Sequence, residues 1–337
     1  MNISKRFNLI KRNTQEVLTE GELKKLLEKK KHPSAYWGTA TSGRIHIGYL
    51  IPVLKIADFL KAGFKFKILL ADLHAHLDDQ KSPWSLLDAR TVYYQEMITA
   101  MFEALKIDIT KLMFVRGRDF QTNPEYTLDV LRMSALTTLA RTKRAAAEVV
   151  RFGKEPKMGG FFYPLMQTED IPALDIDVAF SGVDQRQIYA LSRELLPQLG
   201  HKKPICVFTP MLPGLTGAKM SASDAKSKID LLDSKKDIEK KVNSAYCVEG
   251  SLKDNGVIAF VEHFIFSFKG KLEISRPKKF GGDVCYDDFN ELKKDFVSKK
   301  LHPMDLKQAV SEELNKLLEP VRKKFEKKKS LLKEAYP

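Results

Sequence analysis

The segment Ser42–Leu50, with the sequence SGRIHIGYL, places a histidine and a glycine two residues apart at the expected start of a helix. A helix N-terminus presents unpaired N–H groups and a partial positive charge, both of which suit a phosphate. There His46 can donate a hydrogen bond to a phosphate oxygen, and Gly48 lets a nucleotide approach the backbone closely. Taken alone, the segment is a weak signal, because a surface histidine near a helix start is the commoner explanation.

A second segment, Gly214–Asp233, carries Lys219 among small polar residues behind two glycines. A lysine on a mobile loop can move onto a polyphosphate as charge develops during phosphoryl or nucleotidyl transfer. The stretch KMSAS, which starts at Lys219, is more specific than the histidine motif. The occurrence of both in one chain favours a nucleotide site over an ordinary polar loop.

A third segment, YPLMQTEDI, spans residues 163–171. On a helix, Tyr163, Gln167 and Asp170 stand at i, i+4 and i+7, which is one face. Three polar groups on one stripe among apolar neighbours need partners, so they indicate either a bound polar ligand or an internal polar network.

A fourth segment, FSGVDQRQI, spans residues 180–188 and runs from a strand through Gly182 into a helix. Ligands of open α/β sheets bind at the carboxyl ends of the strands, where Asp184 and Gln185 would stand. Asp184 suits a ribose hydroxyl and Gln185 suits an amine or a carboxylate. The simpler interpretation is that Asp184 only caps the helix.

The elements that must position these groups alternate between strand and helix. Short apolar runs predict strands at 34–40, 66–70, 111–117 and 177–182. The spacing of Leu50, Leu54, Ala57 and Leu60 predicts a helix that starts close to Gly48, since Pro52 is tolerated only in a first turn. This alternation is typical of a doubly wound, Rossmann-like parallel sheet, which is an α/β fold.

The composition changes after about residue 230, where the chain becomes rich in lysine and its apolar residues follow a helical spacing. We expect a catalytic domain over 1–230 and a mainly α-helical domain over 231–337. The region at about 115–160 is expected to be an insertion between the two halves of the sheet. The basic run at 322–333 is typical of a solvated helix face.

The whole chain has a formal net charge of +14, a surplus that favours a polyanionic partner such as nucleic acid. No apolar run is long enough to span a membrane, and the N-terminus lacks a secretory signal pattern, so we expect a cytoplasmic protein with no membrane partner. The three cysteines are scattered, which argues against disulfides and against a cysteine zinc site. We therefore expect no protein-bound metal and no tightly bound prosthetic group.

Taken together, these segments resemble the class I aminoacyl-tRNA synthetases. The first two are similar to the two nucleotide-binding elements of that class. The segments ADLHA, EYTLDV, YPLMQ, VDQRQ, PGLTGAKMSAS, SKIDLLD, FGGD and LHPMDLK resemble the tyrosyl-tRNA synthetase family of the eukaryotic cytosolic and archaeal type, over nearly the whole chain. The resemblance implies ATP-dependent activation of L-tyrosine to tyrosyl-adenylate, followed by transfer of tyrosyl to the terminal ribose of tRNA(Tyr). It also implies Mg²⁺ with the ATP, and a homodimer formed through the insertion, with one tRNA spanning both subunits.

Carried over residue by residue, the resemblance implies a role for each part of the site. Tyr36 and Asp170 would hold the phenolic hydroxyl of tyrosine, and Tyr163, Gln167 and Gln185 its α-ammonium. Residues lining the side-chain slot would be Gly38, Leu69, Ala71 and His74. Catalytic groups at the ATP phosphates would be Thr41, His46 and Lys219. Residues beside the rest of the ATP would be Gly48, Tyr49, Gly182, Asp184, Met220 and Ser221. Residues at the anticodon would be Phe280, His302 and Asp305.

Three positions depart from the family pattern. Tyr49 takes the place of the last residue of the first element, which is usually a second histidine. Ala222 stands where many class I enzymes have a second lysine, and Ser181 where relatives often have glycine. None of the three removes a group that has been assigned an essential contact.

Three competing interpretations remain. A tryptophanyl-tRNA synthetase would need one acceptor for a ring N–H, whereas Tyr36 and Asp170 are two groups suited to a phenol. A small-molecule nucleotidyltransferase would leave the basic helical part unexplained. A non-catalytic tRNA-binding relative would not need to keep Gln167, Gln185 and Lys219.

Overall fold

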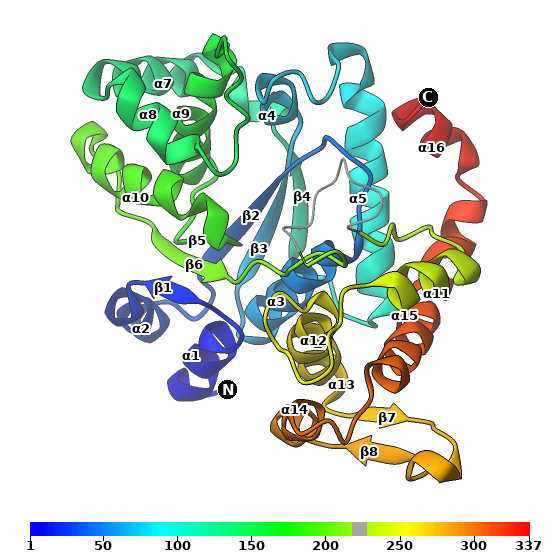
Figure 1. The fold of residues 1–337 in the computed structure, drawn as a ribbon. Coiled ribbons are helices and arrows are strands. Elements are labelled where there is room, and N and C mark those ends of the chain that lie inside the picture. The colour runs from blue at the N-terminus through cyan, green and yellow to red at the C-terminus, as the bar shows by residue number, and fades with distance from the viewer. Residues whose placement is uncertain (218–227) are drawn as a thin grey trace.

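The computed structural model of the protein describes residues 1–217 and 228–337. Its centre is a six-stranded sheet in the order β1-β6-β5-β2-β3-β4, in which β1 alone runs antiparallel (Figure 1). The elements up to the fourth strand are α1 (Ile3–Lys11), β1 (Glu16–Leu18), α2 (Glu20–Lys29), β2 (Ser34–Ala40), η1 (Ile47–Tyr49), α3 (Leu50–Lys61), β3 (Lys65–Ala71), α4 (Asp72–Leu77), η2 (Trp84–Leu86), α5 (Leu87–Ala104) and β4 (Leu112–Arg116).

The second half of the sheet follows a group of helices. These elements are α6 (Arg118–Gln121), α7 (Pro124–Leu136), α8 (Leu139–Ala146), α9 (Met158–Ala173), β5 (Val178–Gly182), η3 (Val183–Gln185), α10 (Arg186–Leu195), η4 (Leu196–Leu199) and β6 (Ile205–Thr209). The chain builds outward from β2 to β3 and β4, then returns to place β5 on the other side of β2. The strand order therefore reverses between β2 and β5, which is where open α/β sheets bind ligands. The predicted doubly wound α/β fold is confirmed.

The two faces of the sheet are buried under different helices, because successive side chains of a strand point to opposite faces. Trp37, Ile68 and Phe180 join a core cluster with α3 and α5. Tyr36 and Leu69 belong to a separate cluster on the opposite face, together with residues of α9 and α10. A residue on one of these strands thus faces either the α3 side or the α9 side, and Tyr36 faces α9.

The start of α3 lies close to the position predicted from the sequence. His46 is the N-cap residue of the 3₁₀ helix η1, with its Nδ1 accepting a hydrogen bond from the Gly48 N–H at 3.2 Å. The α-helix begins at Leu50, so Pro52 lies in its first turn, where its missing N–H costs no helix hydrogen bond. The helix ends at Lys61, and Gly63 follows with a φ of +90°. Gly63 adopts the left-handed conformation that glycine tolerates best after a helix.

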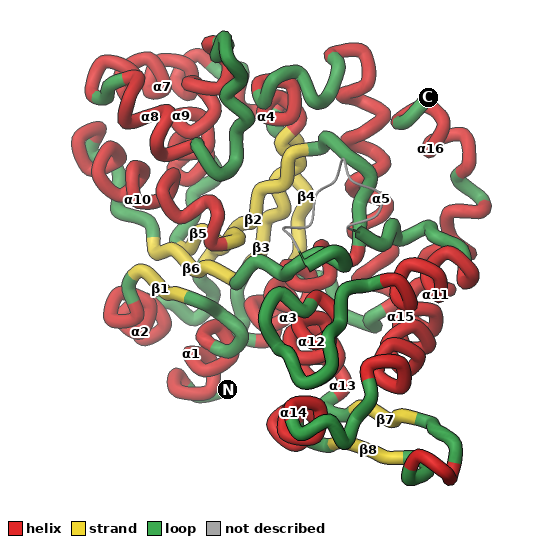
Figure 2. The backbone as a smooth tube through the Cα atoms, viewed as in Figure 1, coloured by secondary structure: helices red, strands yellow, loops and turns green. Residues whose placement is uncertain are grey.

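The C-terminal part is mainly helical and carries a two-stranded hairpin. Its elements are α11 (Lys235–Ser244), α12 (Gly256–Phe260), the π-helix η5 (Val261–Phe266), α13 (Ser267–Lys269), β7 (Leu272–Ile274), η6 (Lys278–Phe280), β8 (Val284–Tyr286), α14 (Phe289–Val297), α15 (Pro303–Glu326) and α16 (Lys329–Ala335). Figure 2 shows this antiparallel hairpin lying apart from the central sheet.

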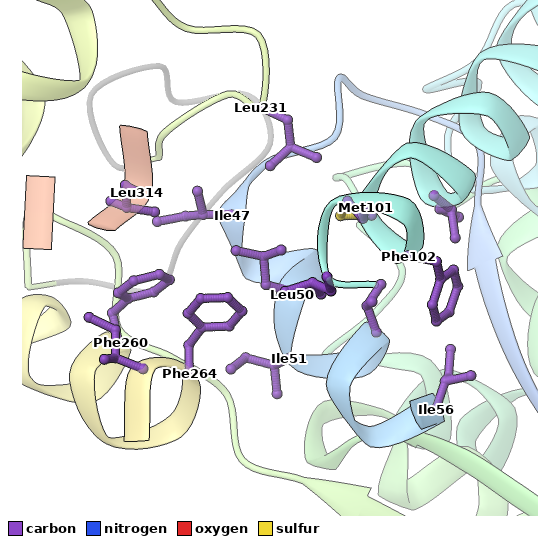
Figure 3. Close-up of a cluster of buried hydrophobic side chains, with 14 of the residues drawn as sticks. Ile47, Leu50, Ile51, Ile56, Met101, Phe102, Leu231, Phe260, Phe264 and Leu314 are labelled. Atoms are coloured by element: carbon purple, nitrogen blue, oxygen red, sulfur yellow. The ribbon is translucent and has the colours of Figure 1, made fainter. Parts of the chain in front are cut away.

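One hydrophobic core joins the C-terminal helices to the sheet. Leu50 and Ile51 of α3 pack between Phe102 of α5 and Phe264 of the π-helix (Figure 3). The last helix, α16, packs against α5, and the Tyr336 hydroxyl donates to the Gly43 carbonyl at 2.8 Å. The helical part is therefore fastened to the loop that carries His46. In the described ranges, no helix is long and apolar enough to cross a bilayer.

The basic run at 322–333 is more than a solvated face. Lys324 pairs with Glu103 of α5 at 2.8 Å, and Lys328 pairs with Glu96 of the same helix at 2.7 Å. Exposed ion pairs contribute little energy individually. Here they line the seam between α5 and the C-terminal helices, which the shared core already holds together.

Candidate active site

Two cavities of about 300 Å³ each lie at the carboxyl ends of β2 and β5. The first, the Asp170 cavity, is lined by all nine residues that were assigned to the tyrosine substrate: Tyr36, Gly38, Leu69, Ala71, His74, Tyr163, Gln167, Asp170 and Gln185. The second, the His46 cavity, is lined by His46, Gly48, Tyr49, Gly182 and Asp184. Trp37, Tyr49 and Asp184 line both cavities, so the two are neighbours with a common wall.

Asp170 is fully enclosed and held by two donors. Gln121 donates from Nε2 at 2.7 Å and Tyr126 donates from its hydroxyl at 2.9 Å, both to Oδ1. The other oxygen, Oδ2, lies 3.8 Å from Nε2 of His74. Burial raises the pKa of Asp170 to about 7, although the two hydrogen bonds lower it. The carboxyl group is therefore poised between its neutral and charged forms near neutral pH.

The surroundings of Asp170 contain polar atoms without partners. The Nε2 atom of His74 and the Oε1 atom of Gln121 are buried and make no hydrogen bond within the described part of the chain. Burial lowers the pKa of His74 to about 4, so its ring is neutral at pH 7 and contributes no charge. Unpartnered buried polar atoms next to a cavity are typical of a site that takes a polar ligand. Asp170 and Tyr36 line the same cavity and could both hydrogen-bond to one hydroxyl group.

Tyr36 comes from the middle of β2, and its hydroxyl lies 3.0 Å from the hydroxyl of Tyr189 on α10. Burial raises the pKa of Tyr36 well above its ordinary value, so the group stays protonated. The stripe on α9 is formed as predicted, since Tyr163, Gln167 and Asp170 all line one cavity. Gln167 donates from Nε2 to Oε1 of Gln185 at 2.7 Å, which couples α9 to the turn after β5.

Several residues of this site were not assigned from the sequence, and four of them contact the assigned groups or add charge. Gln121 and Tyr126 support Asp170 from α6 and α7, and Tyr189 supports Tyr36. Asp78 adds a further carboxylate to the cavity wall, besides Asp170 and Asp184, and accepts from the Arg151 N–H at 3.2 Å. Tyr126 lies within the EYTLDV segment, but nothing in its spacing indicates a contact with α9.

The His46 cavity has the features of a nucleotide site. Burial lowers the pKa of His46 to about 4, with Lys228 adding to the effect, so the ring is neutral. Because Nδ1 accepts from Gly48, we assign the ring proton to Nε2, where it can be donated to a ligand. A Cβ on Gly182 would lie 2.6 Å from Oδ1 of Asp184, so this glycine is required for the close approach of the turn to the strand.

Tyr49 is integrated into the wall that the two cavities share. Its hydroxyl lies 3.2 Å from Oγ1 of Thr39 and 3.5 Å from the hydroxyl of Tyr94. Its ring packs edge-on against Trp37 and His46, with centroids 5.9 and 5.4 Å apart. Tyr49 thus positions the histidine ring beside it, a function that its sequence position did not reveal.

The three groups expected at the phosphates are placed differently. His46 lines a cavity, whereas Thr41 is completely buried and lines neither cavity, and its hydroxyl has no hydrogen-bond partner among residues 1–217 and 228–337. Its neighbour Ser42 lines the Asp170 cavity instead. Lys219, Met220, Ser221 and Ala222 lie outside the described residues.

The segment that follows those residues is attached to the histidine motif. Ile229 and Leu231 exchange backbone hydrogen bonds with Ile47 and Ile45, at 3.0 and 3.3 Å, in an antiparallel bridge between His46 and Asp230. Motifs far apart in the sequence are therefore joined through their main chains. This pairing places the end of the lysine segment beside the start of α3.

The expected anticodon residues lie at the far end of the C-terminal part. Phe280 is exposed in η6, with Nζ of Lys279 4.9 Å from the centre of its ring. His302 is the exposed N-cap of α15, and Asp305 lies in the first turn of that helix. Arg276 links the two regions, because it donates to the carbonyls of Gly282 and Lys300 at 2.7 and 3.2 Å.

Comparison with known proteins shows one consistent similarity. The model of the family described as tRNA synthetases class I (W and Y) matches residues 28–319. The chain is 49% identical to the tyrosine–tRNA ligase of Haloarcula marismortui, covering 100% of this chain and 98% of that protein. It is also 49% identical to the cytoplasmic tyrosine–tRNA ligase of Danio rerio, but covers only 63% of that longer protein. The solved tyrosyl-tRNA synthetase of Archaeoglobus fulgidus, complexed with L-tyrosine, superposes with a TM-score of 0.90 at 42% identity, over 96% of this chain and 99% of that chain.

Proposed function

Since the chain belongs to the class I tRNA synthetases for tryptophan and tyrosine, we infer that it is the tyrosine-specific member, a tyrosine–tRNA ligase. Such an enzyme activates L-tyrosine with ATP to tyrosyl-adenylate and pyrophosphate. It then transfers the tyrosyl group to the 3′-terminal ribose of tRNA(Tyr). The observation that carries the choice of tyrosine is the buried carboxyl group of Asp170, held by Gln121 and Tyr126 and facing a cavity shared with Tyr36.

Recognition of tyrosine follows from this geometry. Asp170 accepts the phenolic hydroxyl, and Tyr36 makes a second hydrogen bond to the same oxygen. Phenylalanine in this slot would leave both groups unpaired, and each unpaired buried group costs about 1–3 kcal/mol. At the other end of the cavity, Tyr163, Gln167 and Gln185 hold the α-ammonium group, with the Asp78 carboxylate supplying negative charge.

The activation step needs positioning and charge stabilisation rather than a protein base. The tyrosine carboxylate is already ionised and attacks the α-phosphate of ATP, with pyrophosphate as the leaving group. His46 donates from Nε2 to a phosphate oxygen, and Gly182 and Asp184 receive the adenosine. Lys219, with Met220 and Ser221, completes the phosphate site. Thr41 would have to turn out of the core to join it.

We propose that Mg²⁺ arrives with ATP and is held mainly by phosphate oxygens and water. Mg²⁺ retains several of its waters and is commonly bound through substrate phosphates rather than by an all-protein cage. It is therefore part of the substrate complex rather than a resident cofactor.

The tRNA contacts are proposed from charge and from exposed aromatic surface. A net charge of +14 suits a polyanion. An exposed aromatic ring beside lysines is suited to stacking with an unpaired base, and Phe280 has this environment. We assign Phe280, His302 and Asp305 to the anticodon. The corresponding division into a catalytic unit over 1–230 and an anticodon-binding unit over 231–337 is likewise proposed.

A homodimer is proposed through the helices between β4 and β5. Four leucines of α7 and α8 are exposed: Leu128, Leu131, Leu136 and Leu139. Leu128 and Leu131 are three residues apart and share one helix face. Grouped exposed leucines favour a protein interface over a solvated surface. With a second copy of the chain on this face, one tRNA could contact both subunits. We place the protein in the cytoplasm, as the names of several relatives do for those proteins.

One experiment tests the proposed function against its rivals. ATP–pyrophosphate exchange is measured in parallel with tyrosine, with tryptophan and without an amino acid. We expect exchange with tyrosine alone. Exchange with tryptophan would indicate the tryptophan-specific branch, and exchange without an amino acid would indicate a different nucleotidyltransferase. No exchange with any of them, from a folded protein, would indicate a non-catalytic relative.

A further inference from the structure

A cluster of three metal-ligating side chains lies outside both cavities. Asp129 of α7, Glu169 of α9 and His201, which follows η4, each offer one ligand atom, and these atoms lie within 4.8 Å of one another. Three separate elements therefore converge on one point. None of the three residues lines the Asp170 cavity or the His46 cavity.

Glu169 is the residue of this cluster that points to a cation ligand. The residue is 4% exposed, and its Oε2 atom is buried without a hydrogen-bond partner among the residues that the structure describes. Burying a carboxylate is costly unless a partner or a cation compensates it. Glu169 precedes Asp170 on α9 but lines neither cavity, and its ligand atom lies within 4.8 Å of those of Asp129 and His201. Its carboxylate thus meets Asp129 and His201.

The other two ligands are already oriented toward each other. Nε2 of His201 lies 3.0 Å from Oδ2 of Asp129, and Nη1 of Arg132 donates to Oδ1 of Asp129 at 2.8 Å. Gly200, with a φ of +88°, turns the chain so that His201 lies against the end of η4. A metal ion would take the place of the hydrogen between Nε2 and Oδ2. The ring proton would then sit on Nδ1, and Arg132 could keep its contact with Oδ1.

We propose that Asp129, Glu169 and His201 form a site for one Zn²⁺ ion. An imidazole nitrogen with two carboxylates is a recognised type of zinc ligand set, and water would complete the tetrahedron. The nitrogen ligand disfavours Mg²⁺ and Ca²⁺, which prefer oxygen. The expectation of no metal rested on the spacing of the cysteines. That spacing gives no information about a site made of a histidine and two carboxylates.

The ion would fix the position of the helix that supports the Asp170 carboxyl group. Tyr126, which donates to Asp170, lies one helical turn before Asp129 on α7. Zn²⁺ would therefore connect α7 to α9 directly behind the Asp170–Tyr126 hydrogen bond. We assign the ion a structural role, since the site has no contact with either cavity.

The test is direct metal binding to the full chain. Chelator-treated protein, kept reduced, is dialysed against Zn²⁺, and the bound metal is measured. Parallel samples compare the wild type with Glu169→Gln, which keeps the size of the side chain and removes its charge. We expect the variant to bind one Zn²⁺ fewer per chain, or to bind it at least about 100-fold more weakly. Zn²⁺ should also raise the thermal unfolding midpoint of the wild type more than that of the variant.

Glu125→Gln is the matched control, because Glu125 is exposed on the same helix α7. It should bind Zn²⁺ as the wild type does. Asp129→Asn gives an independent second variant in case Glu169→Gln fails to fold. Equal Zn²⁺ binding by the wild type and the folded variants would overturn the proposal. So would an anomalous scattering peak for Zn²⁺ at other residues only.

Discussion

Arg44 and Asp230 form an ion pair between the segment that carries His46 and the segment that carries Lys219, with Nη2 donating to Oδ1 at 3.1 Å. Asp230 is 7% exposed, and its main chain bridges to His46. Burial raises the pKa of Asp230, and Arg44 is the largest opposing influence. The pair therefore holds the end of the lysine-bearing segment against the histidine motif.

Asp230→Asn should loosen this attachment. We expect kcat for tyrosine activation to fall by about 10-fold, because a hydrogen bond to a charged group is lost. The KM for tyrosine should stay nearly constant, since Asp230 does not line the Asp170 cavity. Steady-state pyrophosphate exchange measures both constants. A change in the KM for tyrosine alone would contradict a link between the nucleotide segments.

Asp170→Ala should abolish tyrosine recognition while leaving the fold intact. The phenolic hydroxyl would lose its acceptor, and Gln121 and Tyr126 would lose theirs. We expect tyrosine-dependent exchange to fall by at least about 100-fold. Circular dichroism and nucleotide binding serve as controls for the fold. Unchanged exchange in a folded variant would remove the basis for assigning tyrosine.

His46→Ala should cost far more activity than Tyr49→His. His46 donates to charge that develops in the transition state, and loss of such a donor typically costs about 100-fold or more in kcat. Tyr49 contributes neutral hydrogen bonds to Thr39 and Tyr94, and the loss of one costs up to about 10-fold. Both variants are compared under saturating ATP. Losses of similar size would show that the roles within this segment are misassigned.

The pKa of Asp170, about 7, predicts a pH dependence. The carboxylate form accepts the phenolic hydroxyl, so kcat/KM for tyrosine should rise between pH 6 and pH 8. The step should appear in kcat/KM, which reports the free enzyme, rather than in kcat. Stability should change in the opposite direction. Because the folded pKa lies above the ordinary value of 3.8, the folded state loses stability as pH rises from about 4 through 7. A flat kcat/KM profile for tyrosine would contradict this account.

Leu131→Lys should dissociate the proposed homodimer, because a charge would replace an exposed leucine at the centre of the α7 face. Sedimentation velocity gives the oligomeric state. Val92→Lys is the matched control, since Val92 is an exposed apolar residue on α5. A dimer that survives Leu131→Lys, or a wild type that is monomeric, would contradict the assigned interface.

Local patterns in the sequence predict much of the fold. The run SAYWGTA forms β2 over the predicted range Ser34–Ala40, because a short β-prone run followed by a glycine-containing turn leaves little choice. The helical period also brings Tyr163, Gln167 and Asp170 to one cavity. In both cases, the information lies within a few residues of the group concerned.

What the sequence did not reveal depends on contacts between distant segments. Gln121 and Tyr126 reach Asp170 because α6 and α7 dock against α9, and no period in their own segments encodes that docking. Tyr189 reaches Tyr36 for the same reason, because α10 packs on the sheet face from which Tyr36 projects. The burial of Thr41 was also missed, since its neighbours Ala40 and Ser42 are only partly buried and nothing in the local sequence distinguishes Thr41 from them.

The C-terminal helices connect two distant parts of the molecule. The 24-residue helix α15 begins at the residues assigned to the anticodon and spans about 36 Å. Beyond it, α16 brings Tyr336 to the Gly43 carbonyl, in the loop that holds His46. The helices α15 and α16 therefore connect the residues proposed for the anticodon to the loop that holds His46. If tRNA binding at one end changes the affinity for ATP at the other, thermodynamic reciprocity requires that ATP change the affinity for tRNA by the same factor.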